Sequence, residues 1–527
     1  MSSKVKVEAP SRSSSKETIV QMVGITKRFP GVVANDHIDF DIRSGEVHAL
    51  LGENGAGKTT LMNILYGLYQ PDEGEIYFYG QKVRIKSPKD AIRLGIVMSH
   101  QIFRQVLRFS IAENIALHTS LGLILSKKEI ERRISEIANE LGWDIDPNAK
   151  IYQLSAETRQ KIEIVKALLY EPKVLILDEP TSLLSLQGKL ELFKQIKRLK
   201  EKGLGIVYIT HKLDEVLAIS DRITILRKGK KVKVLNTSEA TKEDLARYMV
   251  GRDVLFTLTK TPSKKKGKPV LEVKNLHVLG DRNEKAVNGV SFTVYEGEIL
   301  GVAGVGGSGQ RELAEAIAGL RKVKTGEIRI LGENLTNANP RKIAERGVGF
   351  IPEDRLVKGL VPELDIKENL ILRMYFKPPC RKGLFLDEDF IRKYCDEKIC
   401  QYNIVAPDLS TKVKFLSGGN LQRLLLARET SWNPKLLIAA YPTFGLDVAS
   451  TEYVRKLLLK LRDMGSAILL ISEDLDEIMM LSDRIAVLYE GKLMGILNAE
   501  EATKERIGLM MTGTPKEKLP NKTDKDT

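Results

Sequence analysis

Short apolar runs alternate with longer amphipathic stretches along most of the chain. The runs at 46–51 (EVHALL), 174–178 (VLILD) and 205–210 (GIVYIT) are largely apolar on both faces and rich in β-branched residues. This pattern is typical of strands that are buried inside a parallel sheet. The region 104–172 is rich in lysine and glutamate and is predicted to be helical. The pattern therefore predicts an α/β core with a helical subdomain.

The same pattern occurs twice. GEVHALLGENGAGKTT at 45–60 aligns without a gap with GEILGVAGVGGSGQRE at 297–312, at an offset of 252 residues. LILDEPT at 175–181 pairs with LIAAYPT at 437–443 at an offset of 262 residues. Such ordered matches predict a tandem duplication. The second copy has gained about ten residues around FKPPCRKGLF (376–385).

A phosphate-binding loop is predicted after the first buried strand of copy one. Residues 52–59 read GENGAGKT and fit the pattern G-x-x-x-x-G-K-[ST] between a strand and a helix. In such loops successive backbone N–H groups surround a phosphate, the lysine reaches the β- and γ-phosphates, and the hydroxyl holds Mg²⁺. We therefore predict that ATP is bound by Gly52, Glu53, Asn54, Gly55, Ala56, Gly57, Lys58, Thr59 and Thr60.

Two acids end the apolar strand VLILDEP. Asp178 is suited to bind magnesium, and Glu179 is suited to act as general base for the attacking water. In isolation such a pair is more often an ordinary strand end, and a single histidine such as His211 is more often structural. Phe29, upstream of the loop, could stack on adenine, although a core position is the commoner role for such a residue.

Together these motifs resemble the ATP-binding cassette family. The resemblance rests on GENGAGKTT, Gln101, LILDEPT, His211 and the signature LSGGN at 416–420. It implies tandem P-loop ATPase domains, each with a RecA-like α/β core and a helical subdomain. It also implies that Gln101 and His211 act with Glu179 in catalysis, and that Thr59, Gln101 and Asp178 hold Mg²⁺. In this family the loop of one copy faces the signature of the other, so Ser417, Gly418 and Gly419 would close over ATP bound to copy one.

The second copy departs from the family pattern. The replacements are Gln310 for the lysine, Arg311 for the hydroxyl, Glu353 for the glutamine, Ala440 and Tyr441 for the acids, and Glu473 for the histidine. The signature of copy one, LSAET, carries Glu157 where a glycine is expected. All these changes fall on one of the two composite sites. We therefore predict a pseudo-dimer within one chain, with one hydrolytic and one degenerate site; whether the degenerate site binds nucleotide is left open.

The chain resembles the ATPase subunits of bacterial or archaeal importers for sugars and nucleosides. MVGR at 249–252, IPEDR at 351–355 and MMTG at 510–513 carry this resemblance, and LIAAYPTFGLDV is closer to the nucleoside branch, which is linked to a basic membrane lipoprotein. The resemblance implies two integral-membrane permeases, an extracytoplasmic substrate-binding lipoprotein and a position on the cytoplasmic face of the membrane. Nucleosides are favoured over ribose- or galactose-type sugars.

The domain boundaries follow from the repeat and from composition. We expect a flexible tail at 1–17, the first cassette at 18–255, a basic linker at 256–269, the second cassette at 270–513 and a flexible tail at 514–527. No apolar stretch approaches the roughly 18–20 residues that a membrane span needs. Cys380, Cys395 and Cys400 are expected to be free thiols.

The net charge of +14 leaves other classes of protein open. It is compatible with a soluble tandem ATPase that acts on ribosomes or nucleic acid. The short linker and the degenerate second copy argue against that class, so no nucleic-acid partner is expected. A dinucleotide-binding reading of Gly304, Gly306 and Gly309 requires an acid at the end of a second strand, and only Glu327, in mid-strand, is available.

Overall fold

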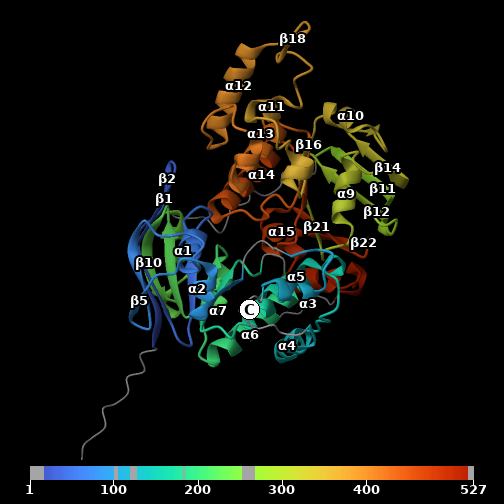
Figure 1. Ribbon diagram of the computed structural model, residues 1–527. Helices are drawn as coiled ribbons and strands as arrows, with labels where there is room; N and C mark the ends of the chain where they lie inside the picture. The colour runs from blue at the N-terminus through green and yellow to red at the C-terminus, as the bar shows by residue number, and fades with distance from the viewer. Residues whose placement is uncertain are drawn as a thin grey trace, which may run out of the picture. The chain divides into compact units, whose positions relative to one another are not determined.

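The computed structural model describes residues 17–99, 105–118, 127–181, 184, 186–251 and 267–519 (Figure 1). The chain divides between residues 254 and 255 into two compact units, called unit 1 and unit 2 below. Gln101 lies outside the described residues, as do residues 252–266, which include most of the predicted linker. None of the described helices is both long enough and apolar enough to cross a bilayer.

Unit 1 contains two sheets. The antiparallel sheet has the order β2-β1-β4-β5, with β1 (Thr18–Phe29), β2 (Val32–Arg43), β4 (Glu73–Phe78) and β5 (Gln81–Val83). The second sheet has the order β10-β9-β3-β8-β7-β6, with β3 (Val47–Leu51), β6 (Ile96–Ser99), β7 (Val174–Asp178), β8 (Gly205–Thr210), β9 (Arg222–Arg227) and β10 (Lys230–Asn236). Strands β3, β7 and β8 are parallel and buried at every residue, which confirms the strands predicted from the apolar runs.

Helices cover the six-stranded sheet of unit 1. They are α1 (Lys58–Leu65), α2 (Pro88–Arg93), α3 (Ile111–His118), α4 (Lys127–Glu140), α5 (Ala156–Leu168), α6 (Leu186–Glu201), α7 (Leu213–Ile219) and α8 (Lys242–Val250). Alternate residues of β8 enter two different cores. Val207 packs with β1, β2 and α1, whereas Tyr208 packs with the helical subdomain α3–α5. This alternation is the side-chain geometry of a strand that is buried on both faces.

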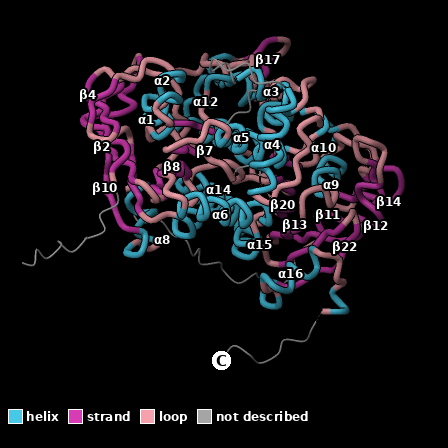
Figure 2. Tube along the Cα trace, turned by 60° about the horizontal axis from the view of Figure 1, so that its bottom comes forward, coloured by secondary structure: helices cyan, strands magenta, loops and turns pink. Residues whose placement is uncertain are grey.

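Unit 2 repeats this topology. Its antiparallel sheet has the order β12-β11-β14-β15, and its six-stranded sheet has the order β16-β19-β20-β13-β21-β22, so the duplication is confirmed. The strands are β11 (Pro269–Leu279), β12 (Lys285–Tyr295), β13 (Ile299–Gly304), β14 (Val323–Ile330), β15 (Glu333–Asn334), β16 (Val348–Ile351), β19 (Leu436–Ala440), β20 (Ala467–Ile471), β21 (Arg484–Tyr489) and β22 (Lys492–Asn498). Figure 2 shows β11, β12 and β14 gathered at one side of this unit.

The helices of unit 2 follow the same order along the chain. They are α9 (Gln310–Ile317), α10 (Pro340–Glu345), α11 (Ile366–Ile371), α12 (Glu388–Gln401), α13 (Gly418–Thr430), α14 (Val448–Asp463), α15 (Leu475–Leu481) and α16 (Lys504–Met511), with a π-helical turn η3 (Arg355–Gly359). The gained segment forms a separate hairpin of β17 (Arg381–Lys382) and β18 (Phe385–Leu386). In the segment predicted as the C-terminal tail, Lys516 Nζ donates to the Ile496 carbonyl of β22 at 2.7 Å.

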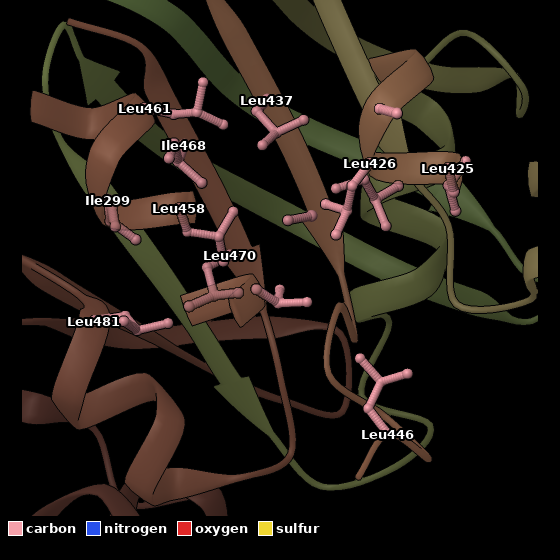
Figure 3. Packing of buried hydrophobic residues seen from close by; sticks show 14 of the residues in the cluster. Ile299, Leu425, Leu426, Leu437, Leu446, Leu458, Leu461, Ile468, Leu470 and Leu481 are labelled. Carbon is pink, nitrogen blue, oxygen red and sulfur yellow. The ribbon is translucent and has the colours of Figure 1, made fainter. Parts of the chain in front are cut away.

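The larger core of unit 2 joins the sheet to the helical subdomain. Side chains from β13, β19 and β20 meet side chains from α13 and α14 in one cluster (Figure 3). Cys380 and Cys395 are buried in this core and Cys400 is exposed, and all three are free thiols, as predicted.

Candidate functional site

In unit 1 the predicted phosphate loop connects β3 to α1. Gly57 caps α1 with φ 98°, a left-handed conformation that favours glycine. A β-carbon at Gly57 would lie 2.2 Å from the Ala34 carbonyl oxygen, and one at Gly52 would lie 2.5 Å from the Leu226 carbonyl oxygen. Side chains are therefore excluded at both positions, and the loop backbone packs directly against β2 and β9.

Lys58, the first residue of α1, folds back over this loop. Its side chain is buried, and Nζ donates to the Gly52 carbonyl at 2.7 Å and to the Glu53 carbonyl at 2.9 Å. These bonds satisfy the buried ammonium while holding it against the loop backbone. The ammonium is thus positioned where phosphate oxygens on the loop would replace the carbonyl partners.

Thr59 and Asp178 bring a hydroxyl and a carboxylate together beside the loop. Thr59 Oγ1 donates to Asp178 Oδ2 at 3.2 Å, from α1 to the end of β7. Burial raises the pKa of Asp178 to about 6, with a further contribution from Glu179, although Thr59 and Lys58 act in the opposite direction. A buried carboxylate that is disfavoured in its charged form is stabilised by a cation.

Glu179 follows directly in a left-handed conformation, φ 48°, and its N–H donates to the Ile209 carbonyl at 3.0 Å. Its Oε1 lies 2.8 Å from His211 Nδ1, at the end of β8. Burial acts to raise the pKa of Glu179, but the hydrogen bond and charge of His211, with Lys58, hold it below its usual value. The two adjacent acids therefore differ in character, and Glu179 is the ionised carboxylate that a general base requires.

The raised pKa of Asp178 predicts that its charged form lowers the free energy of unfolding. Because its folded pKa of about 6 exceeds the ordinary 3.8, the charged form destabilises the folded state above about pH 4. This cost reaches about 3 kcal/mol above pH 6. We expect Asp178→Asn, in urea unfolding with EDTA and no nucleotide, to be more stable by up to about this amount at pH 7.5 and by about half as much at pH 5. Equal stability of variant and wild type at both pH values would contradict this assignment.

Two residues that support the site were not identified from the sequence. Asn35 on β2 is fully buried, and its Nδ2 donates to the Gly57 carbonyl at 3.1 Å. Glu215 on α7 accepts from Thr181 Oγ1 at 2.7 Å and from Tyr208 OH at 2.8 Å, which holds the turn after Glu179. The repeat alignment could have identified Asn35 as a residue of the site. Its counterpart in the degenerate copy two is the apolar Val287, so the polar side chain is present only in the copy with the intact loop.

The remaining predicted nucleotide contacts lie in two places. Phe29, at the end of β1, is 37% exposed and packs edge-on against Tyr69. It is therefore not a core residue, and its ring is partly accessible to a ligand. In unit 2, Ser417 caps α13, where its hydroxyl accepts from the Asn420 N–H at 3.4 Å. Gly418 and Gly419 form the start of that helix, an arrangement that favours an anion.

The loop of unit 2 keeps the backbone shape of its counterpart. Gly309 caps α9 with φ 89°, and a β-carbon there would lie 2.0 Å from the Ala286 carbonyl oxygen. Gln310 is buried, and its Nε2 donates to the Val305 carbonyl at 3.3 Å. Val305 aligns with Glu53, so the amide of Gln310 reproduces one of the two contacts that Lys58 makes. It supplies no positive charge.

The chemistry around the unit 2 loop is altered. Tyr441 has the same left-handed backbone conformation as Glu179, with φ 50°, and its N–H donates to the Ile471 carbonyl at 2.8 Å. Ala440 offers no metal ligand. Glu473 Oε1 lies 3.3 Å from the position of a β-carbon on Gly306. Burial and the charge of Glu353 raise the pKa of Glu473. An acid therefore faces the loop where unit 1 has a histidine.

Glu157 is engaged within unit 1. It pairs with Lys161 at 3.2 Å, and its Oε1 lies 2.5 Å from the position of a β-carbon on Gly188 of α6. Its carboxylate thus lies between a lysine of its own helix, α5, and the neighbouring helix α6.

Comparison with known proteins places these features in a family. The family model described as ABC transporter matches residues 35–182 and 287–443, one match in each unit. The chain belongs to the ABC transporter family. It consists of two ABC ATPase cassettes, and it is an ATP-binding ATPase, as the resemblance of its motifs implied.

Relatives match over nearly the whole length of this ABC protein. It is 44% identical to the nucleoside import ATP-binding protein NupA of Lactococcus lactis, over 95% of this chain and 99% of that protein. It is 44% identical to the guanosine import ATP-binding protein NupO of Bacillus subtilis, over 94% and 98%. The glucose import ATP-binding protein TsgD13 of Haloferax volcanii is 43% identical over 95% and 96%.

The tandem ABC fold also has a solved counterpart. A structure of the archaeal ribosome recycling factor aABCE1 in complex with the ribosomal stalk protein aP1 matches with a TM-score of 0.60 at 20% identity, over 88% of this chain and 87% of that chain. At this identity the likeness concerns the fold alone.

Proposed function

We propose that the chain is the ATPase subunit of an importer and that its transported solute is a nucleoside. The proposal is carried by the full-length similarity to two import ATPases with nucleoside substrates. It is supported by the catalytic geometry of unit 1, which brings Lys58, Asp178, Glu179 and His211 to one loop. The cassettes transduce energy, so the solute itself is recognised by other subunits.

Thr59 and Asp178 fit a Mg²⁺ ion. Their hydroxyl and carboxylate oxygens, 3.2 Å apart, are hard ligands of the kind that Mg²⁺ prefers. Burial raises the pKa of Asp178, so a bound cation would stabilise its charged form. When bound, Mg²⁺ would neutralise charge on the transferred phosphate. The proposed role of Gln101 as a further ligand concerns a residue outside the described part of the chain.

Unit 1 carries the proposed chemistry. The N–H groups of residues 52–60 and the Lys58 ammonium orient the phosphates of ATP, and Phe29 stacks on the adenine. Glu179 accepts a proton from the attacking water, while His211 Nδ1, 2.8 Å from Glu179 Oε1, orients that carboxylate. The start of α13, with Ser417, Gly418 and Gly419, completes the charge stabilisation of the γ-phosphate from the second cassette, so that one chain forms a pseudo-dimer.

Partner permeases are proposed to contact a groove in each cassette. In unit 2 a cavity of about 610 Å³ lies beside η3, and its lining includes Phe350, Glu353, Arg355 and Phe444 together with Arg311 and Ala440 of the degenerate site. Burial lowers the pKa of Arg355, whose guanidinium donates to the Phe444 carbonyl. This mixed apolar and charged cavity supports docking of a permease segment. The proposed assembly contains two integral-membrane permeases and an extracytoplasmic substrate-binding lipoprotein, with this chain on the cytoplasmic face of the membrane.

Reconstitution tests the proposed substrate. The chain is combined with candidate permeases and a candidate substrate-binding lipoprotein from the same organism, and ATP hydrolysis is measured in proteoliposomes with guanosine, adenosine, ribose or glucose. We expect nucleosides, and not free sugars, to stimulate hydrolysis. Stimulation by a sugar alone would overturn the nucleoside assignment, and copurification with ribosomal particles instead of permeases would overturn the importer assignment.

A monosaccharide importer is the second candidate. It is favoured by the glucose-import relative, which is 43% identical to this chain, one percentage point below the nucleoside-import relative NupA at 44%. The similarity to the ribosome recycling factor provides no comparable support for a ribosome-bound or nucleic-acid-bound ATPase, since it concerns fold alone.

The unit 2 loop is expected to remain inactive after a single repair. Gln310→Lys restores the cation, but Ala440 still lacks a metal ligand and Glu473 still faces the loop. We expect the variant to bind the same number of Mg²⁺-ATP per chain as the wild type and to hydrolyse ATP within about twofold of the wild-type rate. Equilibrium dialysis with radiolabelled nucleotide measures this stoichiometry. A tight site that the wild type lacks, together with a hydrolysis rate raised more than twofold, would show that the missing lysine alone inactivates the loop.

A further inference from the structure

The hairpin that unit 2 has gained has a fixed base and a projecting turn. Its two strands pair only with each other, Arg381 opposite Leu386 and Lys382 opposite Phe385. At the base, Cys380 is fully buried in the core, and its backbone carbonyl accepts a hydrogen bond from the Asp387 N–H at 2.9 Å. The two views show the hairpin at the edge of the unit, beyond α12 (Figures 1 and 2).

The tip of this hairpin is apolar and exposed. Leu384 is 86% exposed and Phe385 is 79% exposed, the two highest values for large apolar side chains in the described part of the chain. Gly383, with φ 61°, allows the tight two-residue turn that places Leu384 at the end. An isolated two-stranded hairpin is marginally stable in water, and exposing adjacent large apolar side chains forgoes the benefit of burying them. The tip is therefore better suited to an apolar environment.

Positive charge lies on and next to the hairpin in the sequence. Lys377 and Arg381 are exposed, and none of the described carboxylates lies within ion-pair distance of either. The nearby acids are in the first turn of α12, where the helix dipole favours them. Asp387 pairs with Lys382, and Glu388 pairs with Lys367 at 3.0 Å. Asp389, the third acid at this end of α12, is exposed, so the acids at the base are only partly neutralised, whereas residues 383–386 at the tip include no acid.

We propose that the hairpin tip inserts into the interface of an anionic lipid membrane. Leu384 and Phe385 enter the boundary between headgroups and acyl chains, and Lys377 and Arg381 contact lipid phosphates. A short convex apolar tip flanked by cations matches the shallow depth and the negative charge of that interface. The inference rests on the proposed importer function, which places the chain beside the membrane.

Vesicle binding tests this proposal without any permease. The purified full chain is mixed with vesicles of phosphatidylethanolamine and phosphatidylglycerol, or of phosphatidylcholine alone, and sedimented. We expect binding to the anionic vesicles, weakened by salt, and a reduction of at least about tenfold for Leu384→Ser/Phe385→Ser. Leu331→Ser, at an exposed turn between β14 and β15, is the matched control and should bind as the wild type does.

Two results would overturn the proposal. One is failure of the wild-type chain to bind anionic vesicles, or equal binding by the double variant. The other is a double variant that binds vesicles normally but loses association with detergent-solubilised permeases, which would assign the tip to a protein partner. Association of the wild-type chain with the permeases separates this outcome from failure of the proposed importer function. ATP hydrolysis by the double variant shows that it is folded, because the hairpin lies outside the catalytic residues.

Discussion

Glu179→Gln should lower steady-state ATP hydrolysis by about 10²–10⁴-fold. The glutamine side chain keeps the size of Glu179 and can still accept a hydrogen bond from His211, but it cannot accept the proton of the attacking water. Because the pKa of Glu179 is held below its usual value, the wild-type carboxylate is ionised throughout the physiological pH range. Phosphate release from the assembled transporter, measured with saturating Mg²⁺-ATP, gives the rate. Nucleotide binding should be retained.

The matched control for this experiment lies in unit 2. Tyr441 occupies the position equivalent to Glu179, with φ 50° against 48° and the same backbone bond to the neighbouring strand. We expect Tyr441→Phe to hydrolyse ATP within about twofold of wild type, since the unit 2 loop carries no catalytic acid. If Glu179→Gln retains about half of the wild-type rate, both loops are active and the proposal of a single hydrolytic site is wrong.

Lys58→Ala should lower ATP hydrolysis by about 10²–10³-fold, mainly through lost binding of Mg²⁺-ATP. The Lys58 ammonium lies against the loop, where it can form charge-assisted hydrogen bonds to phosphate oxygens. The alanine side chain of the variant forms no such bonds. Isothermal titration with Mg²⁺-ATP measures the loss of affinity. The loop shape should persist, because the backbone of Gly57 is held by the packing of β2 and by Asn35.

Gln310→Ala is the control for the loop lysine. It removes the amide that contacts the Val305 carbonyl but no charge, so nucleotide affinity and hydrolysis should be close to those of wild type. A loss of affinity comparable with that of Lys58→Ala would indicate that the unit 2 loop contributes a nucleotide site of its own. Thermal unfolding of both variants separates loss of binding from loss of fold.

Much of this protein could be predicted from its sequence because the informative features are local. The order of residues 52–59 specifies a strand, a turn that requires glycine and a helix start, and each of these depends on neighbours in the chain. The buried strands were recognised by their apolar runs. The repeat at offsets of 252 and 262 residues identifies each counterpart in unit 2 from sequence alone.

Other features of the site depend on residues that are far apart in sequence. The bond between His211 and Glu179 joins two strand ends, and Asn35 reaches the loop from a different sheet. Neither contact has a local pattern, because the first depends on the pairing of β7 with β8 and the second on how the two sheets pack. The separate electrostatic characters of Asp178 and Glu179 have the same origin, since burial and neighbouring charge differ for adjacent carboxyl groups.

The sequence by itself thus determined the duplication, the family and the residues with altered chemistry in the second copy. Only the tertiary structure decided what those altered residues do. It places the Gln310 amide on a carbonyl of an unchanged loop, directs Glu473 at that loop, engages Glu157 with Lys161, and exposes the tip of the gained hairpin. The physical reason is that residue identity fixes which groups are available, whereas direction, burial and partner are set by long-range packing.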